Sequence, residues 1–175
     1  MTSRGEGGMT LMEMVVGLAI FAILAGIAWP SYTGWQEREG LSSAFMQVKA
    51  ALSRARASSV QQGLYWGRVT YNGNTCQRLW FGVQFNPGNA TLDHQYYCES
   101  PPGDQVMDAG EIRTLRTTDL AREVAVTLST TLPNDRVFFR KAGTASNFNI
   151  NQSVTLGAGG ENEVVTLLPT GRIGE

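Results

Sequence analysis

An apolar segment near the N-terminus constrains this chain more than any other feature of its sequence. Residues 14–29 read MVVGLAIFAILAGIAW and contain no charged side chain. Counted from Met9, the segment has 21 residues. As an α-helix it extends about 31 Å at ~1.5 Å per residue, whereas the hydrocarbon core of a bilayer is about 30 Å thick. The segment is therefore long enough to span a membrane once.

A buried core helix and a cleaved secretory signal are the two other interpretations of such a segment. A secretory signal carries a site of small A-x-A-like residues behind its apolar stretch, but here the bulky sequence Ala28-Trp29-Pro30 follows. Glu13 lies inside the segment, where an ionisable side chain costs about 2.5–3.5 kcal/mol at the bilayer centre and less near its edge. We therefore favour a membrane span in which Glu13 has a functional reason.

The order of residues around this span resembles the type IV pilins and the pseudopilins of type II secretion. Gly7-Gly8 is followed by Met9-Thr10-Leu11-Met12-Glu13, then by the apolar run and Pro30. The resemblance implies that a prepilin peptidase cuts on the cytoplasmic side after Gly8 and that the new N-terminus, Met9, is N-methylated. Glu13 and Pro30 then become the fifth and twenty-second residues, as in the family. The first mature residue is more often Phe, so Met9 is a departure.

The same resemblance implies an organisation in four parts: a leader at 1–8, a transmembrane or filament-core helix at 9–29, an amphipathic continuation at 30–63 and a β-rich periplasmic head at 64–175. Arg4 ahead of the span favours a cytoplasmic leader, which predicts a single-pass inner-membrane protein. In a filament, Glu13 would neutralise the Met9 amine of a neighbouring subunit, whereas a lone subunit would keep it unpaired. Pro30 removes a backbone donor, which predicts a helix kink.

Beyond Pro30 the sequence predicts a helix followed by strands. Leu41, Phe45, Val48 and Leu52 recur at helical spacing and predict one buried stripe, and Gly63 suits a left-handed C-cap. Period-two runs then predict strands at 64–71, 78–85, 95–98, 123–128, 136–140, 153–156 and 164–168, divided by turns that include Asn72-Gly73, Pro101-Pro102-Gly103 and Gly157–Gly160. The predicted fold class is α+β and pilin-like, with a long helix packed on a mostly antiparallel β head.

The C-terminal part narrows the resemblance to the GspH/FimT group, which includes FimU. Leu52-Ser-Arg-Ala-Arg56 late in the helix and the runs 136–140, 153–156 and 164–172 carry it, whereas residues 72–120 match no motif. The resemblance implies a minor subunit that primes filament assembly at or near the tip and partners other minor pilins or pseudopilins. Whether the filament is a pilus or a secretion pseudopilus stays open.

Cys76 and Cys98 are the two cysteines of the chain, and both fall in the part expected outside the cytoplasm. Disulfides persist in oxidising compartments. A bridge closing this 23-residue segment would stabilise the fold by about 3 kcal/mol in the loop-entropy model. We expect the bridge, and two buried free thiols are the alternative.

Candidate catalytic and metal-binding residues are few. One histidine and two cysteines exclude most multi-histidine and zinc-finger sites. Asp104, Asp108 and Glu111 could hold calcium, but their spacing is unlike an EF-hand and favours a solvated loop. His94 has no Ser/Asp or Cys arrangement that would make it a general base. We therefore expect no enzyme activity, no cofactor and no metal.

DNA uptake is the alternative function, because some FimT proteins, which this chain resembles, bind DNA through a C-terminal Gly-Arg-x-Arg tail. Here the tail reads Gly171-Arg172-Ile173-Gly174-Glu175, so glycine replaces the second arginine and Arg172 is the one candidate contact. The whole chain has 14 Lys and Arg against 15 Asp and Glu, which gives no general attraction to phosphates. A nucleic-acid partner is therefore disfavoured.

Overall fold

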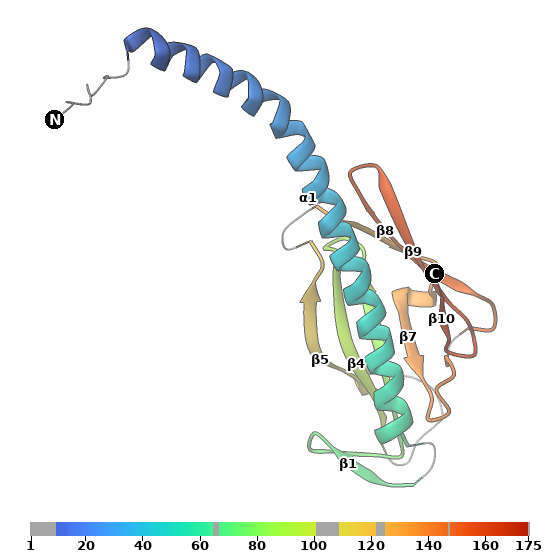
Figure 1. The fold of residues 1–175 in the computed structure, drawn as a ribbon. Coiled ribbons are helices and arrows are strands. Elements are labelled where there is room, and N and C mark those ends of the chain that lie inside the picture. Colours follow the sequence, from blue (N-terminus) through green and yellow to red (C-terminus); the bar gives the residue numbers. More distant parts are fainter. Residues whose placement is uncertain (1–9, 65–66, 101–108, 122–124, 147, 175) are drawn as a thin grey trace, which may run out of the picture. The chain divides into compact units, whose positions relative to one another are not determined.

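The computed structural model describes residues 10–64, 67–100, 109–121, 125–146 and 148–174. It divides into two compact units, an N-terminal unit of residues 1–36 and a C-terminal unit of residues 37–175. One long helix, α1 (Leu11–Gln62), starts in the first unit and ends in the second. The remaining elements are strands and two short 3-10 helices, η1 (Ala109–Glu111) and η2 (Pro133–Asp135), all in the C-terminal unit (Figure 1).

Helix α1 ends at Gln62, directly before the glycine expected to cap it. The expected left-handed conformation is wrong, because Gly63 is not among the glycines with positive φ. Its amide N instead donates to Ser59 O at 3.0 Å, as in one more helical turn. A Cβ at Gly63 would lie 2.2 Å from that oxygen. Glycine is therefore required here by the close approach of the backbone and not by its handedness.

The predicted stripe of the helix forms the centre of the core. Leu41, Phe45, Val48 and Leu52 expose 3%, 8%, 0% and 0% of their surface, and they belong to one cluster with side chains from both four-stranded sheets. Burying a side chain of this size stabilises a fold by about 1.5–3 kcal/mol. The second half of α1 is thus held in the C-terminal unit by the face that its sequence predicts.

In the described part of the chain, ten strands form three antiparallel sheets. A hairpin pairs β1 with β2, one four-stranded sheet has the order β5-β4-β3-β7, and the other has the order β10-β9-β8-β6. Figure 1 shows the second half of α1 running across β4. The strand bounds are β1 (Val69–Tyr71), β2 (Asn74–Cys76), β3 (Arg78–Asn86), β4 (Thr91–Glu99), β5 (Ile112–Asp119), β6 (Thr127–Thr130), β7 (Arg136–Phe139), β8 (Gln152–Ala158), β9 (Glu161–Leu167) and β10 (Ile173–Gly174).

The antiparallel β expectation is confirmed, but several strand predictions need correction. The single strand expected at 64–71 is wrong: Leu64 makes an isolated bridge to Leu79, Gly67 has a φ of 133°, and the strand begins at Val69. Strand β5 was missed, because it contributes one edge of its sheet and most of its side chains are exposed, which leaves little apolar alternation to read. Of the strand expected at 123–128, residues 123–124 lie outside the described residues, and β6 begins at Thr127.

The predicted turn at Asn72-Gly73 is confirmed. These residues join β1 to β2 with φ values of 48° and 81°, the left-handed pair that a two-residue hairpin turn requires. The glycine turn between β8 and β9 is also present, at Gly159 and Gly160. The turn expected at 101–103 lies outside the described residues.

Candidate assembly site

The N-terminus of α1 carries a reciprocal pair of hydrogen bonds between Thr10 and Glu13. The Glu13 amide donates to Thr10 Oγ1 at 3.3 Å, and the Thr10 amide donates to Glu13 Oε2 at 3.4 Å. This is a capping box, in which the N-cap residue just before the helix and the residue three positions on satisfy each other's backbone donors. Both bonds join a backbone amide to a side-chain oxygen and neither brings a positive charge to Glu13, so the expected charge pairing of Glu13 in a filament stays a prediction.

The apolar segment that follows is uncovered along its length. Every large apolar side chain described between Leu11 and Trp29 is between 48% and 83% exposed. Among the described residues, α1 is the one helix long and apolar enough to cross a membrane, with a mean hydropathy of 2.4 over its best window and none of that window buried. A surface of this kind requires lipid or other apolar helices around it.

The other residues expected at this end differ in how far the structure describes them. Gly8 and Met9, the expected cleavage and methylation positions, lie outside the described residues. Helix α1 continues through Pro30 without a break in its assignment, and the kink stays a prediction. Trp29 and Trp35 expose 74% and 59% of their surface, which suits the membrane interface at which indoles accumulate.

Ser59 links the end of α1 to the sheet, and its only signal in the sequence is a polar residue on the buried face of the helix. Its hydroxyl donates to Phe139 O at 2.7 Å and accepts from Phe81 N at 2.8 Å. The residue is fully buried, so both polar contacts are made away from water, where unmade hydrogen bonds are costly. Ser59 thus links α1 directly to β3 and β7.

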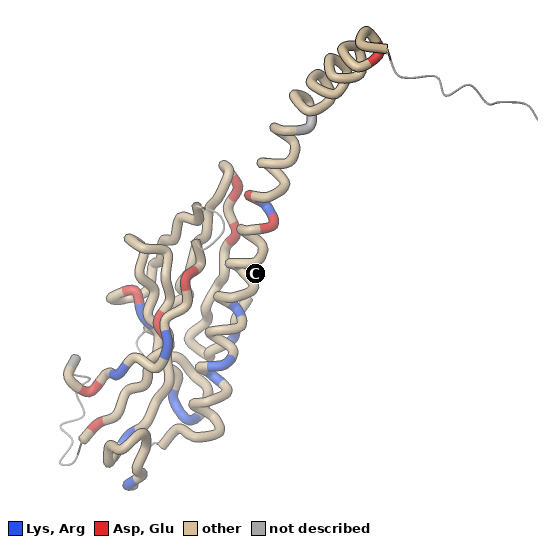
Figure 2. The backbone as a smooth tube through the Cα atoms, turned by 90° about the vertical axis from the view of Figure 1, so that its left-hand side faces the viewer, with Lys and Arg blue, Asp and Glu red and all other residues tan. Residues whose placement is uncertain are grey.

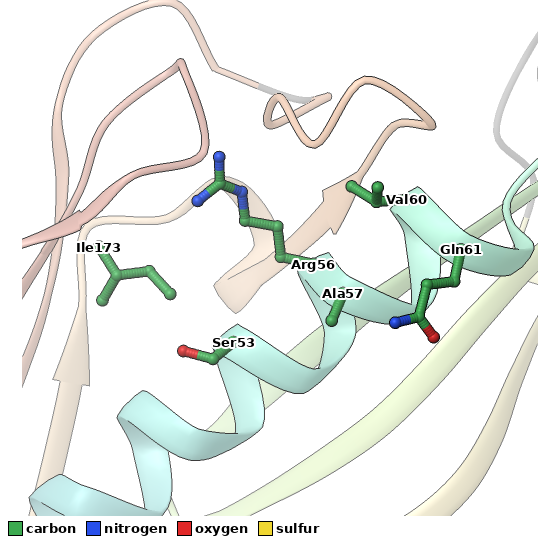
Figure 3. Close-up of a pocket in the computed structure, with 6 residues that line it drawn as sticks. All are labelled: Ser53, Arg56, Ala57, Val60, Gln61 and Ile173. Carbon is green, nitrogen blue, oxygen red and sulfur yellow. The ribbon is translucent and has the colours of Figure 1, made fainter.

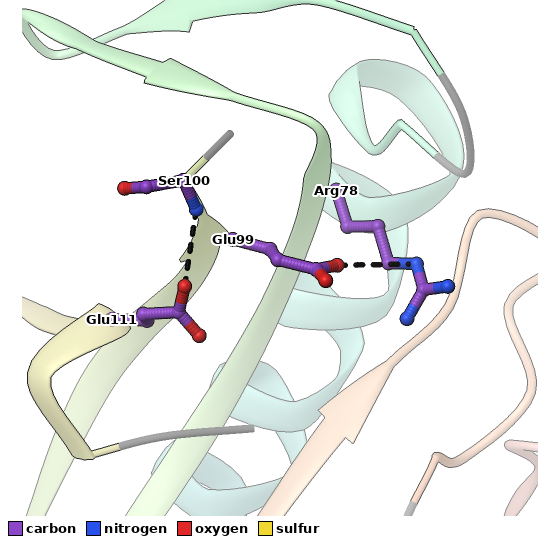
Figure 4. A network of polar contacts seen from close by, with 4 residues as sticks. All are labelled: Arg78, Glu99, Ser100 and Glu111. Atoms are coloured by element: carbon purple, nitrogen blue, oxygen red, sulfur yellow. Dashed lines mark hydrogen bonds and ion pairs between the residues drawn. The ribbon is translucent and has the colours of Figure 1, made fainter. Parts of the chain in front are cut away.

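The two cysteines expected to pair are bonded to each other, with their Cα atoms 5.0 Å apart. The bond joins β2 to β4 beside a buried ion pair that sequence analysis missed. Arg78 Nε lies 3.2 Å from Glu99 Oε2, and these side chains expose 11% and 2% of their surface. The two residues are directly opposite in the β3–β4 register, so only the pairing of these strands could have revealed the contact (Figure 4).

The candidate calcium cluster is described only in part. Asp104 and Asp108 lie outside the described residues. Glu111 Oε1 accepts a hydrogen bond from Ser100 N at 3.1 Å, which ties η1 to the end of β4 (Figure 4). Among the residues that the structure describes, no group of three or more His, Cys, Asp or Glu side chains could hold a metal ion.

His94 lies in β4 and is half-buried on the side of the sheet that faces α1, where it lines a pocket with residues of α1 and β5. Burial is the main cause that lowers the pKa of His94, and Arg116 and Arg54 lower it further, while Asp93 raises it. A neutral imidazole is therefore favoured at this position.

Arg172, the candidate DNA contact, is exposed at the turn before β10. The turn packs closely against the backbone at Gly143, because a Cβ on Gly171 would lie 1.8 Å from Gly143 O. Arg56 Nε donates to the same oxygen at 3.2 Å. Arg56 and the neighbouring Ile173 line a small cavity with Ser53, Ala57, Val60 and Gln61 of α1 (Figure 3). The Arg56 Nε already donates to a backbone oxygen, so Arg172 stays the one candidate DNA contact at this end. DNA binding there stays a prediction.

Comparisons with known proteins agree with the N-terminal motif and with the fold described above. Residues 3–29 match the prokaryotic N-terminal methylation motif. The fold is similar to that of the type IV minor pilin FimU from Pseudomonas aeruginosa PAO1, with a TM-score of 0.55 and 20% identity over 80% of this chain and 90% of FimU. A second crystal form of FimU gives a TM-score of 0.51 and 19% identity over 77% and 90% of the two chains. None of the curated proteins compared with the sequence matches it significantly.

The two matches differ in extent, since the motif covers residues 3–29 and the structural likeness covers 80% of the chain. The likeness shows the fold, and the motif shows a prepilin-type N-terminus. The chain therefore carries a prepilin-type N-terminus on a minor-pilin fold, which supports its resemblance to the type IV minor pilins and pseudopilins of the GspH/FimT group.

Proposed function

We propose that this chain is a non-enzymatic minor pilin or pseudopilin that enters a periplasm-spanning filament through the first half of α1. The observation that carries the proposal is the fully uncovered apolar surface between Leu11 and Trp29, with one carboxylate, Glu13, at its start. Lipid covers that surface before assembly, and the matching helices of other subunits cover it afterwards. In both states the same residues are buried, so transfer between membrane and filament leaves little apolar surface exposed.

Processing by a prepilin peptidase after Gly8, followed by methylation of Met9, precedes entry into the filament. The support for this step is the methylation motif over residues 3–29. Cleavage leaves the capping box intact, because Thr10 keeps its amide and its hydroxyl when the leader is removed. The mature chain therefore starts with a capped helix and one free amine.

Glu13 has two roles in this proposal, helix cap and assembly charge. Its bond to Thr10 N is long, at 3.4 Å, and uses one of the two carboxylate oxygens. An ionised carboxylate offers about four lone-pair sites, so Glu13 can also accept from the methylated amine of a neighbouring Met9. The capping bond lowers the cost of carrying Glu13 in the membrane, and the neighbour's amine neutralises its charge in the filament.

The C-terminal unit lies in the periplasm in this proposal, and the subunit primes assembly at or near the filament tip. The disulfide between Cys76 and Cys98 supports the location, because such bonds persist in an oxidising compartment. The likeness to the minor pilin FimU supports a minor, rather than a major, subunit. The tip position and the priming role follow from the resemblance to the GspH/FimT group.

The decisive experiment separates the two roles of Glu13 with three variants. Glu13→Gln keeps a capping-box residue and deletes the charge, and Thr10→Val deletes the capping hydroxyl and keeps the charge. Glu13→Ala deletes the charge together with the side-chain acceptor for the Thr10 amide, and keeps the Thr10 hydroxyl. Recovery of each variant in sheared filaments is measured by immunoblot, with membrane level and leader cleavage as controls. We expect Glu13→Gln and Glu13→Ala to be lost from filaments alike, while Thr10→Val is incorporated.

Incorporation of Glu13→Gln at the wild-type level would refute the charge pairing and leave the cap as the role of Glu13. N-terminal mass spectrometry of the wild-type chain checks the processing step in the same samples. A mature chain that does not begin at methylated Met9 would contradict the proposal as a whole.

A further inference from the structure

A second polar site lies in the C-terminal unit, far along the sequence from the apolar span. A pocket of about 160 Å³ opens where the second half of α1 crosses the β4–β5 edge of the sheet. Its polar walls come from three elements: Gln47 and Arg54 of α1, His94 of β4, and Arg116 and Thr118 of β5. Its floor is apolar, formed by Ala50, Ala51 and Leu92.

The register of the strands explains why these side chains meet. Arg116 is opposite His94 and Thr118 is opposite Leu92 in the β4–β5 ladder, so the two strands present neighbouring side chains to the pocket. On α1, Gln47 and Arg54 are separated by two helical turns and lie on the same face as Ala51. Two arginines and one histidine therefore converge on one small volume from three separate elements.

None of the described residues that line this pocket is a carboxylate. Asp93, the neighbour of His94 in β4, accepts hydrogen bonds from Asn86 Nδ2 and Thr117 Oγ1, two residues that are not part of the lining. Within the described part of the chain, neither Arg54 nor Arg116 has an ion-pair partner. The sequence from residue 40 to residue 92 contains no Asp or Glu, and Figure 2 shows basic but no acidic positions on this stretch of α1.

The donors of the pocket match an oxyanion. Each guanidinium carries five N–H donors in a planar fork, and the Gln47 amide, the Thr118 hydroxyl and the His94 ring add neutral donors. A carboxylate has two oxygens and needs few of these groups, whereas a phosphate group has three or four and can be bound from several sides. We propose that the pocket formed by Arg54, His94 and Arg116 is a phosphate-group binding site.

The proposal is independent of the filament role, since it uses no residue of the apolar span. It implies that phosphate binding and the protonation of His94 are coupled. The two arginines lower the pKa of His94, and a bound dianion offsets their charge, so phosphate raises that pKa. Asp93 of β4 is the one acidic group that raises it already, and Arg54 and Arg116 are the charged groups that face it from α1 and β5.

His94 is the only histidine of the chain, so its NMR signal needs no assignment. The experiment uses the full processed chain in detergent micelles, labelled with ¹³C-histidine, and follows the ring signal from pH 4.5 to pH 8. Inorganic phosphate is compared with acetate and with chloride at equal ionic strength. We expect a pKa below the usual 6.5 in chloride, a saturable rise of that pKa with phosphate, and a much smaller rise with acetate.

Substitutions of the two arginines test whether phosphate binds in this pocket. Arg54→Gln and Arg116→Gln each remove one charge-assisted contact, which should weaken phosphate binding about tenfold or more, and each should raise the pKa of His94 in chloride. Both side chains are exposed, so the fold is retained, and the chloride titration verifies the geometry without any ligand. Arg172→Gln, at an exposed arginine that does not line the pocket, is the matched control and should change neither value.

Three results would overturn the proposal. The first is a His94 signal that phosphate moves no more than chloride does. The second is an equal response to phosphate and acetate, which would reduce the site to a general positive field. The third is full phosphate response in both arginine variants, which would place the ligand elsewhere.

Discussion

The two halves of α1 use apolar side chains in opposite ways. Between Leu11 and Trp29 every large apolar side chain is at least 48% exposed, whereas Leu41, Phe45, Val48 and Leu52 expose no more than 8%. The first half is apolar all round and the second is apolar along one stripe, the patterns of a lipid-covered helix and of a surface helix on a core. The first half is therefore stabilised by lipid or by other subunits, and the second half is stabilised by packing on the C-terminal unit of its own chain.

This difference locates the effects of mutation. A substitution in the first half changes the interaction with lipid or with other subunits and leaves the C-terminal unit as it was. A substitution in the second half acts on the free energy of unfolding of the C-terminal unit and reaches the filament only through the folded fraction. Glu99 and Leu52 lie inside the core of the C-terminal unit, and each has a matched residue outside that core, Glu161 and Leu24.

The largest expected effect is at the buried ion pair. Glu99→Gln removes the negative charge that lies 3.2 Å from the Arg78 guanidinium, which is 11% exposed, and breaking a buried pair destabilises a fold by about 3–5 kcal/mol. Glu161→Gln is the control, because it breaks an exposed ion pair. Arg38 Nη2 lies 2.9 Å from Glu161 Oε1, and the two side chains are 72% and 51% exposed. That change should cost less than about 1 kcal/mol.

Urea denaturation of the full chain in micelles, followed by the near-ultraviolet signal, measures both variants. A Glu99→Gln protein as stable as Glu161→Gln would mean that the buried pair contributes no more than an exposed one.

Next in size is the comparison within the helix itself. Leu52→Ala removes a fully buried side chain from the core and should lower the free energy of unfolding of the C-terminal unit by about 2–5 kcal/mol. Leu24→Ala makes the same chemical change at a side chain that is 60% exposed, and should leave that free energy unchanged.

The same denaturation measures both leucine variants, and filament recovery is scored beside it. Equal destabilisation by the two changes would break the distinction between the halves of α1. Loss of Leu24→Ala from filaments without any loss of stability would sharpen it.

Sequence alone predicts the features that depend on local pattern. The span, the stripe from Leu41 to Leu52, the end of the helix at Gln62 and the Asn72-Gly73 turn all follow from periodicity or turn chemistry over a few residues. The capping box at Thr10 and Glu13 also had a local signal, since Ser or Thr followed three residues later by Glu is its signature. The charge of Glu13 inside an apolar segment is the more conspicuous feature of this residue and masks its capping signal.

Features that depend on the register between strands could not be predicted. The Arg78–Glu99 pair needs β3 aligned with β4, and the contacts of Ser59 need α1 placed over β3 and β7. Strand β5 was missed because an edge strand with two exposed faces shows no apolar alternation. The pocket of Arg54, His94 and Arg116 combines both difficulties, since its residues come from a helix, a buried strand and that edge strand.

The smallest expected effect is a pH dependence of stability at His94. Burial and the two arginines lower the pKa of His94 in the folded chain below the value of about 6.5 for an unfolded histidine. Between those two values the unfolded chain binds more protons than the folded one, so the free energy of unfolding rises with pH across this window and is constant above it. Acidification below pH 6.5 therefore destabilises the C-terminal unit.

The size of this effect is less than about 1 kcal/mol, because solvent at a half-exposed ring screens the arginines. His94→Gln removes the titrating group and should flatten the slope that remains once the carboxylates common to both proteins are subtracted. Denaturation in chloride from pH 5 to pH 7.5 measures the difference between the two proteins. A slope of the opposite sign would require a folded-state pKa above 6.5, and therefore a negative charge closer to His94 than Arg54 and Arg116.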